Sequence, residues 1–579
     1  MTGNSTTGTG LNVSGNATLT NATVSGETQT GTGALVSGKL TADSSTQVTG
    51  KATQDGGTGV TLNGTVTGGK VDGTATSGNA VQITDGGALT NAVVTGNATG
   101  NGTGVALSGA VSLDKTTAEA LNAVSSGGTG LSLEQSANVS VTGLDAVTTA
   151  ELKGLSQSGS GITTAGNVAI RGIVLNGSTS TDSGVGVTLG GNLTIGDDVS
   201  RVTAGATGSG TALVIDNANL QANGYAGTNK GPVILADASG AGGTAVKIQG
   251  DSQLNDVAIV GNATSDGGIG VLLDGQVTGA NILGAAGSGT AVVVTDGTII
   301  NGGIVKGGSH SGTGLAADGN VTLNNALISG DAQDSGGTGV SLNGSITGGT
   351  VNGTSTSGDA VRIKDARLTG TEVNGVSQSG TGVKIQGNVT LKSTELRATS
   401  ENGAADLDVS GSLSYDQLSM INADRVAGRE NMDTPPSPGG DGSGGNAVPD
   451  TGDEGSVTGN NSGTAESGET VTPPPGGNSG DAGNNGNTGS ATGGEGSLPE
   501  NNVAQRGEAP GPAIRERMTG QMFVSAFRQQ AVDAQVTRMN QAAQDGFHSA
   551  TTPVVPVTGY QAKPQNVEIS LCDEDSCQP

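Results

Sequence analysis

A short phrase returns along most of this chain, and it constrains the possible fold more than any other feature. Each copy has a Gly/Ser/Thr turn, an alternating apolar run and a second turn. Most copies start about 21 to 26 residues apart, which is the length of one turn of a solenoid. The repeat therefore predicts a rod of stacked coils. Counted at the first apolar residue after the turn, the copies start at Leu11, near Leu35, and at Val60, Val81, Val105, Leu131, Ile162, Val187, Leu213, Val246, Val271, Val292, Leu315, Val340, Val361 and Val383.

Within a copy, apolar residues alternate with polar ones. The segment from Gly57 reads GTGVTLNG, TVTGGK, VDGTATSG, and the segment from Gly337 reads GTGVSLNG, SITGGT, VNGTSTSG, 280 positions later. Alternation at a period of two indicates short strands with one inward face, and runs of about four to five residues are too short for helices. Asn-Gly pairs such as Asn63-Gly64 stand where the chain must turn, because both residues tolerate positive φ. Three strands and three turns per copy form one coil of a β-helix.

An antiparallel meander is the alternative fold. Its repeats usually bring aromatic or other large side chains to a two-layer core, whereas Tyr225 is the only aromatic residue before Tyr415. The narrow lumen of a β-helix is filled by Val, Leu, Ile, Ala and Thr in stacked ladders. We therefore expect an all-β fold, a parallel, right-handed β-helix solenoid of about sixteen coils. With strands about 4.8 Å apart, this rod is on the order of 75 Å long.

The composition fits an elongated exported protein better than a compact enzyme. The 579 residues include 107 glycines and no tryptophan, and only 1% are aromatic and 13% charged, so we expect no large globular core. The formal net charge of -27 and the lack of a basic stripe argue against nucleic-acid binding. We interpret the acidity as a means of keeping the rod soluble, with a specific acidic binding face as the alternative.

The chain begins inside the repeat, with MTGNSTTGTG, and no secretion leader precedes it. No apolar run approaches the roughly 18 residues required to span a bilayer, so we expect no membrane span. Either the protein stays in the cytoplasm, or the sequence is the C-terminal part of a longer exported chain. A free solenoid end requires a polar cap, which the first copy lacks, so we expect truncation.

Four segments of different composition follow one another. Residues 1–425 carry the repeat, whereas residues 426–512 are rich in Gly, Pro, Ser, Asn and acidic residues, with almost no large apolar residue. Such a sequence cannot bury enough surface to offset its ordering entropy, so it predicts a disordered spacer. Residues 513–545 predict an amphipathic helix, and residues 546–579 form a tail that holds a cysteine pair.

The predicted helix carries a group of large apolar side chains. Met518, Met522 and Phe527 fall at helical spacing, with Phe523 beside them. Two interpretations stay open at this point. The helix either packs on a nearby element or serves as a docking element for a partner.

Cys572 and Cys577 are the only cysteines, and they stand close to the C-terminus. Zinc sites normally need four ligands and Cys-x2-Cys spacing, and His310 and His548 are the only histidines, so we expect no metal site and no cofactor. Thioredoxin-like chemistry needs Cys-x-x-Cys on a β-α scaffold. A small disulfide-closed loop, formed in an oxidising compartment, remains as the interpretation of the pair.

The repeat phrases also carry a family resemblance. The phrases GTGVxLxG at residues 102–109, NVTL at 320–323 and TNAxVxG at 90–96 are similar to those of EtpA-type exoproteins. Together with the spacer and the terminal cysteine pair, they make the chain resemble the two-partner secretion exoprotein adhesins of the filamentous haemagglutinin class. The loop between Cys572 and Cys577 resembles the C-terminal anchor of the high-molecular-weight adhesins in that class. The N-terminal secretion domain of the family is not found in this sequence.

The resemblance implies a function and two partners. Members of the family attach to a host-cell surface protein or glycan, and they leave the cell through an outer-membrane two-partner secretion transporter. A terminal disulfide loop tethers the adhesin at that transporter, which implies that Cys572 and Cys577 anchor this chain. We therefore expect an adhesin fragment, secreted or held on the bacterial cell surface in association with the outer membrane. Its rod presents shallow faces of Thr, Ser and Asn whose weak contacts are summed over many coils.

An enzyme is the alternative class. Polysaccharide-degrading β-helices use clustered carboxylates beside Arg or Lys on one face. We interpret the densest charge groups of the rod as solvated turn charge, so no catalytic residue is nominated. A β-helical polysaccharide-degrading enzyme that uses Asp359 and Asp365, and a non-functional remnant of a larger adhesin, remain as alternatives. The charge groups are Asp197, Asp198 and Arg201, and Asp359, Arg362, Lys364, Asp365 and Arg367.

Overall fold

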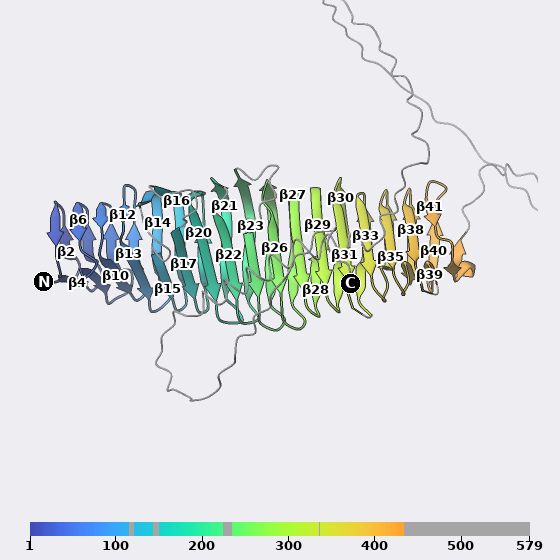
Figure 1. Cartoon of the computed structure of the whole chain (residues 1–579), viewed down its shortest axis with the longest axis horizontal. Helices are drawn as coiled ribbons and strands as arrows, with labels where there is room; N and C mark the ends of the chain where they lie inside the picture. Colours follow the sequence, from blue (N-terminus) through green and yellow to red (C-terminus); the bar gives the residue numbers. More distant parts are fainter. Residues whose placement is uncertain are drawn as a thin grey trace, which may run out of the picture. The chain divides into compact units, whose positions relative to one another are not determined.

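The computed structural model describes residues 1–114, 121–142, 150–197, 199–223, 234–334, 336–403 and 405–433. Within these residues the chain forms one sheet of 43 strands whose neighbours run parallel. A strand pairs with the equivalent strands one coil before and one coil after it, so the coils stack along one axis, from blue to orange in Figure 1. The prediction of an all-β, parallel β-solenoid of about sixteen turns is confirmed.

The described residues include almost no helix. One turn of 3-10 helix, Arg429–Asn431, is the single helical element among them, and none of their helices is long and apolar enough to cross a membrane. The last strand is β43 (Met432–Asp433). The predicted helix at residues 513–545 and the tail at 546–579 lie outside the described residues, as does the predicted spacer beyond residue 433.

Each coil has three faces, which we name in the order of their strands. The first face carries the GTGV-type phrase, the second face follows it in the chain, and the third face leads into the next coil. Several strands bend at a corner and continue from one face to the next. Strands that begin on the first face are β2 (Thr9–Val13), β5 (Thr32–Val36), β8 (Thr58–Leu62), β11 (Asn79–Ile83), β14 (Thr103–Asp114), β16 (Thr129–Thr142), β18 (Ser160–Thr164), β21 (Val185–Ile195), β23 (Thr211–Ala222), β25 (Thr244–Asn255), β27 (Ile269–Ala286), β28 (Thr290–Val294), β30 (Thr313–Asn324), β32 (Thr338–Thr347), β34 (Val361–Thr369), β36 (Val383–Gln386), β39 (Leu407–Val409) and β42 (Val426–Ala427).

Separate strands make up the rest of the other two faces. Those that begin on the second face are β3 (Ala17–Leu19), β6 (Lys39–Ala42), β9 (Thr65–Thr67), β12 (Ala88–Thr90), β19 (Asn167–Arg171), β29 (Ile299–Ser309), β37 (Asn388–Lys392), β40 (Ser412–Tyr415) and β43. Those of the third face are β1 (Thr2–Asn4), β4 (Thr23–Thr28), β7 (Gln47–Ala52), β10 (Lys70–Ala75), β13 (Val93–Ala98), β15 (Leu121–Ser125), β17 (Ala150–Ser156), β20 (Ile173–Thr179), β22 (Arg201–Ala206), β24 (Ile234–Ala238), β26 (Ile259–Ala263), β31 (Leu327–Ala332), β33 (Thr350–Ser355), β35 (Glu372–Ser377), β38 (Glu395–Ser400) and β41 (Met420–Asn422).

The core consists of ladders in which like side chains stack on like. On the first face, Val60 stacks on Val81, and Val81 on Val105, and all three are fully buried. Two residues further along, Leu62 stacks on Ile83 in the same way. The V-x-L pattern of the phrase places both apolar residues on the inward side, because successive side chains of a strand point to opposite faces. Stacked aliphatic side chains therefore fill the lumen without aromatic residues.

The coil is narrowest where its third face meets the first face of the next coil, an edge that we call the narrow edge. A Cβ on Gly330 would lie 2.0 Å from the carbonyl oxygen of Gly339, and a Cβ on Gly339 would lie 2.4 Å from that of Thr354. One coil on, a Cβ on Gly353 would lie 2.1 Å from the carbonyl oxygen of Ala360. The position equivalent to Gly339 in the next coil holds Ala360, so this edge favours glycine or alanine.

The turns at the narrow edge have two forms. In the shorter form a buried hydroxyl closes the turn: Ser377 Oγ accepts a hydrogen bond from the Gly380 amide at 2.9 Å and donates to the Gly358 carbonyl oxygen of the coil before at 3.0 Å. Alanine replaces the hydroxyl in some short turns, as at Ala286, and in longer ones, as at Ala332, where a left-handed glycine such as Gly336, with φ of 82°, turns the chain. The amide-to-hydroxyl bond of the shorter form recurs at Thr28, Ser125, Ser156, Ser309, Ser355 and Ser400.

Candidate interaction surface

The site residues that the sequence nominates lie outside the described part of the chain. They are the cysteines Cys572 and Cys577 and the apolar residues Met518, Met522, Phe523 and Phe527. The disulfide loop and the docking helix therefore stay predictions. The rod supplies the surface that the structure describes, and its outward side chains are the groups available for binding.

Threonines form an outward file on the second face of the N-terminal coils. Thr41, Thr67 and Thr90 occupy equivalent positions in successive coils, and Thr18 precedes them in the same file. The neighbouring Leu40, like its counterparts in the next coils, is fully buried, so the threonines point away from the core. Each hydroxyl both donates and accepts hydrogen bonds, and adjacent coils are about 4.8 Å apart. The file is therefore a straight row of hydrogen-bonding groups.

Asparagines form hydrogen-bonded ladders on the same face of later coils. Asn192 Nδ2 donates to Asn167 Oδ1 at 2.6 Å, and Asn324 Nδ2 donates to Asn301 Oδ1 at 2.8 Å. A side-chain amide has two N–H donors and two lone pairs, so each ladder leaves further groups directed to solvent. The asparagine ladders extend the polar character of the second face beyond the threonine file.

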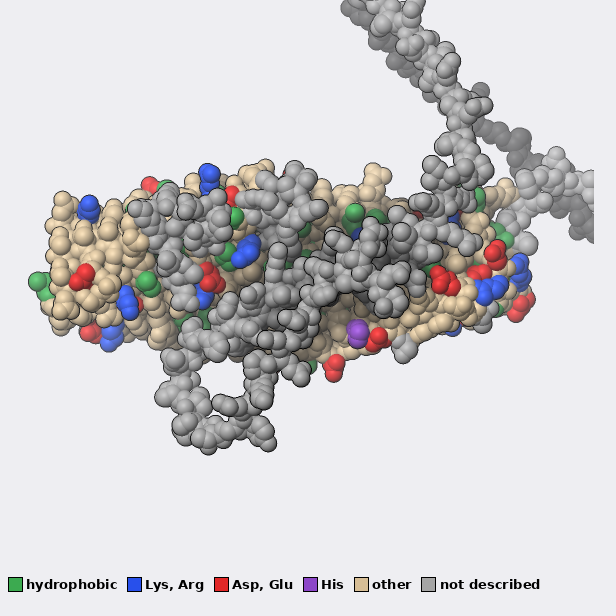
Figure 2. Space-filling view, viewed as in Figure 1, with side chains coloured by type: hydrophobic (Ala, Val, Ile, Leu, Met, Phe, Trp, Pro, Cys, Tyr) green, Lys and Arg blue, Asp and Glu red, His purple; other side chains and the backbone are tan. Residues whose placement is uncertain are grey.

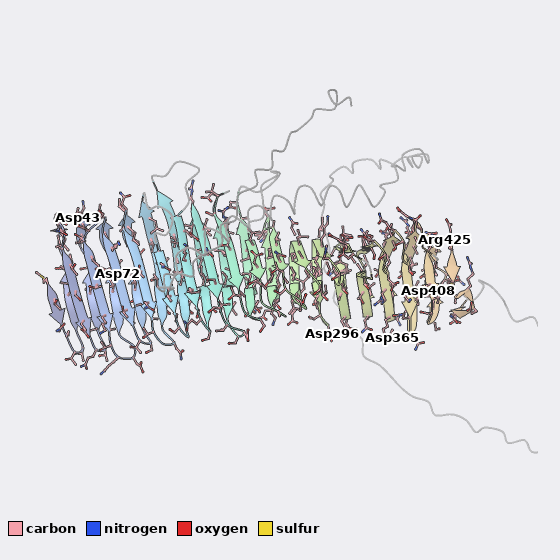
Figure 3. All side chains as sticks on the ribbon, turned by 60° about the horizontal axis from the view of Figure 1, so that its bottom comes forward. Asp43, Asp72, Asp296, Asp365, Asp408 and Arg425 are labelled. Carbon is pink, nitrogen blue, oxygen red and sulfur yellow. The ribbon has the colours of Figure 1, made fainter. Side chains whose placement is uncertain are left out.

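Carboxylates close corners of the coil. Asp85, Asp296 and Asp365 each accept a hydrogen bond from a backbone amide of the following coil, at 3.0, 2.6 and 3.0 Å respectively. Figure 3 places Asp296 and Asp365 along one edge of the rod. At a corner near the C-terminal end, the hydroxyl of Ser419, 2.7 Å away, is the main group that holds the pKa of Asp416 below its usual value. Part of the acidity of the chain therefore stabilises the corners of the fold.

The acidic residues of the two densest charge groups also make structural contacts. Asp359 Oδ2 accepts hydrogen bonds from Arg362 Nη2 at 2.8 Å and Nε at 3.0 Å. Asp365 closes a corner, as described above, and Asp197 Oδ2 accepts a bond from a backbone amide of the coil before at 2.6 Å. Asp198 lies outside the described residues. No group of three or more His, Cys, Asp or Glu side chains that could hold a metal ion occurs in the described ranges.

Basic side chains gather on two adjacent coils near the C-terminal end of the rod. Arg362, Lys364 and Arg367 belong to β34, and Lys384 and Lys392 belong to β36 and β37 of the next coil. These are five of the 24 Lys and Arg residues of a chain with a net charge of -27, and no Lys or Arg occurs between residues 307 and 361. We call these five residues the basic cluster. Figure 2 shows charged side chains close together toward the C-terminal end of the rod.

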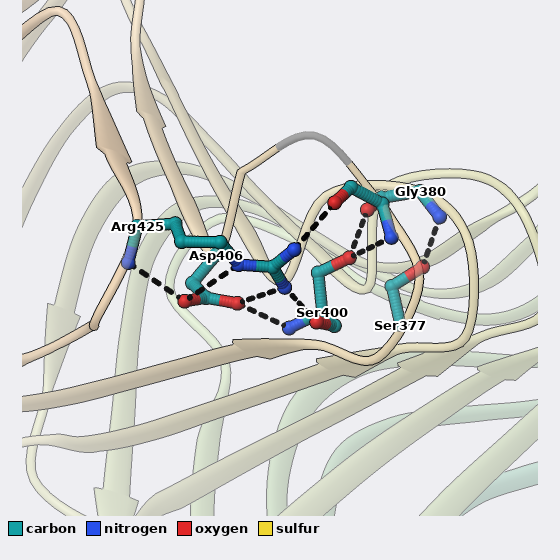
Figure 4. A network of polar contacts seen from close by, with 6 residues as sticks. Ser377, Gly380, Ser400, Asp406 and Arg425 are labelled. Carbon is teal, nitrogen blue, oxygen red and sulfur yellow. Dashed lines mark hydrogen bonds and ion pairs between the residues drawn. The ribbon is translucent and has the colours of Figure 1, made fainter.

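One ion pair, between a buried carboxylate and an exposed guanidinium, closes the last coils of the rod. Asp406, which is 4% exposed, accepts hydrogen bonds from the Ser400 amide at 2.7 Å and from Arg425 Nη2 at 2.8 Å (Figure 4). Arg425 also donates to the carbonyl oxygens of Ser400 and Gly403. Burial alone would raise the pKa of Asp406, but the bonds from Arg425 and Ser400 bring that pKa below its usual value. The bond to Asp406 raises the pKa of Arg425, so the pair stays ionised.

A shallow depression lies at the corner between the second and third faces. Asn325, Gly349 and Gly370 turn the chain there with φ of 52°, 65° and 61°, and they carry only small side chains or none. Leu327 and Glu372 border the depression. Because it is open to solvent and runs across several coils, it suits a segment of an extended ligand.

Comparisons with protein-family models, with curated proteins and with solved structures find no match for this chain. The resemblance to the filamentous haemagglutinin class therefore stays a proposal. The functional assignment depends on the outward faces of the rod.

Sequence reasoning interpreted Arg362, Lys364 and Arg367 as solvated turn charge and missed both their stacking with the next coil and the ion pair of Asp406 with Arg425. Arg362 and Lys384 follow the apolar start of two successive copies of the phrase, so an alignment of the copies indicates that they stack. The ion pair carries a similar signal, because Asp406 and Arg425 directly precede Leu407 and Val426, which pair in register in successive coils.

Proposed function

We propose that this chain is an adhesin, a rod that attaches to a host-cell surface protein or glycan through shallow polar faces. The observation that carries the proposal is the repetition of outward hydrogen-bonding side chains, such as Thr41, Thr67 and Thr90, in successive coils. A row of donors and acceptors at one spacing suits a ligand that itself repeats, as a glycan chain does. Weak contacts along one rigid rod then add up to firm attachment.

Host glycans are the favoured ligand class within this proposal. Hydroxyl and amide side chains exchange hydrogen bonds with sugar hydroxyls in both directions, because each group donates and accepts. The depression lined by Asn325, Leu327 and Glu372 is open and shallow, which suits part of a chain-like ligand. These features support a binding role for the rod.

We also propose a route to the cell surface. The repeat phrases resemble those of two-partner secretion exoproteins, and a parallel solenoid, right-handed in this proposal, agrees with the resemblance. The chain then leaves the cell through an outer-membrane transporter and acts in secreted form or on the bacterial surface. A disulfide between Cys572 and Cys577 tethers it at the transporter.

Binding of the purified chain to cultured host cells and to immobilised neutral glycans tests the adhesin proposal. Thr67→Ala with Thr90→Ala removes two hydroxyls from the second face, and Thr74→Ala with Thr95→Ala removes two from the third face of the same two coils. We expect the first double variant to weaken retention and the second to leave it unchanged. The proposal is contradicted if the wild-type protein binds neither cells nor glycans. If both double variants are retained equally, the threonine file is not part of the binding surface.

The tether is tested separately in a version of the chain that is exported. Cys572→Ser with Cys577→Ser should move the protein from the cell surface to the medium, because the loop can no longer close. Immunoblots of the two fractions measure the shift. Unchanged surface retention of the double variant would overturn the anchoring role of the cysteines.

A further inference from the structure

We propose that the basic cluster binds a phosphorylated polysaccharide, with Lys364, Arg367 and Lys392 as the side chains that hold its phosphate groups. The proposal rests on the proposed function of the rod as a glycan-binding protein, and it names a second class of glycan and a place on the rod. The cluster is set apart from the threonine file, which lies in the N-terminal coils.

The three side chains lie on the outside of two adjacent coils, on either side of one corner. Lys364 and Arg367 are both exposed and stand on either side of the corner that Asp365 makes within β34. Lys392 is exposed on β37 and pairs in register with Thr369, so it lies one coil on and two positions beyond Arg367. With about 4.8 Å between coils and about 3.3 Å per residue, the Cα atoms of Arg367 and Lys392 are roughly 8 Å apart.

The neighbouring carboxylates neutralise the other two members of the cluster. Arg362 and Lys384 stack on each other in register, and each has its own acidic partner. Asp359 pairs with Arg362 at 2.8 Å, and Asp408 pairs with Lys384 at 3.3 Å. Like charges in direct register are destabilising, and the two carboxylates offset the repulsion between Arg362 and Lys384.

The remaining three cations make no ion pair. Asp365, between Lys364 and Arg367 in the chain, accepts a hydrogen bond from the Asn388 amide at 3.0 Å and keeps its charge, so the three cations and this carboxylate together carry a net charge of +2. No carboxylate of the described ranges forms an ion pair with Lys364, Arg367 or Lys392. Three exposed cations therefore face solvent together on a protein whose net charge is -27.

The three cations that make no ion pair favour phosphate over singly charged groups. The net charge of -27 repels every anion, but at 0.1 M salt charges more than about 10 Å away are largely screened, so the nearby cations dominate at contact. A phosphate monoester carries about -1.5 to -2 charges at pH 7, so it gains more from three cations than a group with one charge does. The planar guanidinium of Arg367 can hold a phosphate through two parallel hydrogen bonds, and Lys364 and Lys392 add point charges.

The surroundings of the cluster suit sugars better than nucleic-acid bases. Thr390 stacks on Ser414 beside the cluster, with their hydroxyl oxygens 3.1 Å apart. Such hydroxyls bind sugar hydroxyls, whereas single-stranded nucleic acids are usually held by base stacking on aromatic rings. Tyr415 is the one aromatic residue in the described ranges, and it packs partly buried against the core.

Binding of the full chain to mannan that carries phosphate monoesters tests the inference. The triple variant Lys364→Gln, Arg367→Gln, Lys392→Gln should lower the affinity about tenfold or more, because all three phosphate-holding charges are lost. Lys39→Gln, Lys51→Gln, Lys70→Gln removes the same charge from exposed positions in the N-terminal coils and should leave the affinity within about twofold. Lys364→Arg with Lys392→Arg should retain binding, and phosphatase-treated mannan should not bind.

Each other outcome overturns the inference. Equal losses in the two triple variants would show that total charge, and not this cluster, attracts the polysaccharide. If heparin or single-stranded DNA binds more tightly than phosphomannan, a phosphorylated polysaccharide is not the preferred ligand of the cluster. Failure here differs from failure of the adhesin proposal, because retention on host cells and neutral glycans is measured with the Thr67 and Thr90 variants, which keep the cluster intact.

Discussion

The N-terminal and C-terminal coils of the rod have the same interior and different exteriors. Val60 stacks on Val81 in the first group as Val340 stacks on Val361 in the second, and all four are fully buried. The outward file of the second face holds threonines throughout the first group, such as Thr67 and Thr90, whereas in the second group it changes from Thr347 and Thr369 to Lys392. Packing thus fixes the inward residues and leaves the outward ones free to vary. The difference teaches that the surface chemistry of this rod resides in outward positions that the packing of the core does not fix.

The largest effect is expected from a change that breaks the common interior. Gly330→Val places a branched side chain where a Cβ would already lie 2.0 Å from the Gly339 carbonyl oxygen. We expect a loss of more than about 3 kcal/mol in the free energy of unfolding, because the narrow edge cannot open without separating two faces. Urea unfolding measures it. Ser329→Val, one residue away on the outward side of β31, is the control and should change the stability by roughly 0.5 kcal/mol or less.

The ion pair at the C-terminal end should give the next largest effect. Asp406→Asn removes the charge that accepts hydrogen bonds from Arg425 and the Ser400 amide. We therefore expect the free energy of unfolding to fall by about 2–3 kcal/mol. Amide hydrogen exchange in the last coils should become faster and measures this loss.

The same variant has a defined pH dependence. The pKa of Asp406 is lowered in the folded state from its usual 3.8, so its contribution is complete above that value and is lost as the pH falls through the lower folded-state pKa. The stability difference between wild type and Asp406→Asn should therefore be constant near neutral pH and shrink in acid. A difference that grows as the pH falls would contradict the assignment.

A smaller loss is expected at the hydroxyl that closes a short turn. Ser377→Ala leaves the Gly380 amide and the Gly358 carbonyl oxygen without this hydrogen-bond partner. The free energy of unfolding should therefore fall by about 1 kcal/mol. Ala332 occupies the equivalent position in a longer turn, so Ala332→Ser tests the converse and should bring no gain of similar size. Denaturant titration of both variants measures the two changes. A loss of stability in Ser377→Ala and an equal gain in Ala332→Ser would show that the stabilising effect of the hydroxyl does not depend on the length of the turn.

The smallest effect is expected from exchanging the exteriors of the two ends. Thr90→Lys and Lys392→Thr swap an outward side chain between the N-terminal and C-terminal coils. Each change should alter the free energy of unfolding by about 0.5 kcal/mol or less, because neither side chain contacts the lumen. Thermal melting of the two variants gives the measurement. A loss above 1.5 kcal/mol in either one would show that the exterior also holds the fold together.

The parallel stacking and the inward residues could be predicted from the sequence. The phrase V-x-L at a period of two fixes which side chains point inward, and its recurrence fixes which residue stacks on which. The predicted starts at Val60, Val81 and Val105 are indeed neighbours in one ladder. This part is readable because one local pattern repeats in almost every coil.

The corners and the exterior could not be predicted in the same way. The hydroxyl that closes the turn at Ser309 is replaced by alanine at the equivalent Ala286, although the two turns have the same length, so the phrase does not reveal which residue stands there. Asp296 closes a corner only because the following coil presents a backbone amide at that height. The basic cluster likewise arises from stacking two coils, since residues of different copies make it together. Contacts between copies decide these features.

The register also bears on how such a rod can change in evolution. Each coil begins and ends at equivalent positions, so a gene rearrangement that inserts or deletes one whole unit rejoins matching ends. The segments that start at Gly57 and Gly337 are alike enough to recombine in this way. The reach of the molecule would then grow or shrink in increments of about 4.8 Å while every remaining unit keeps its shape.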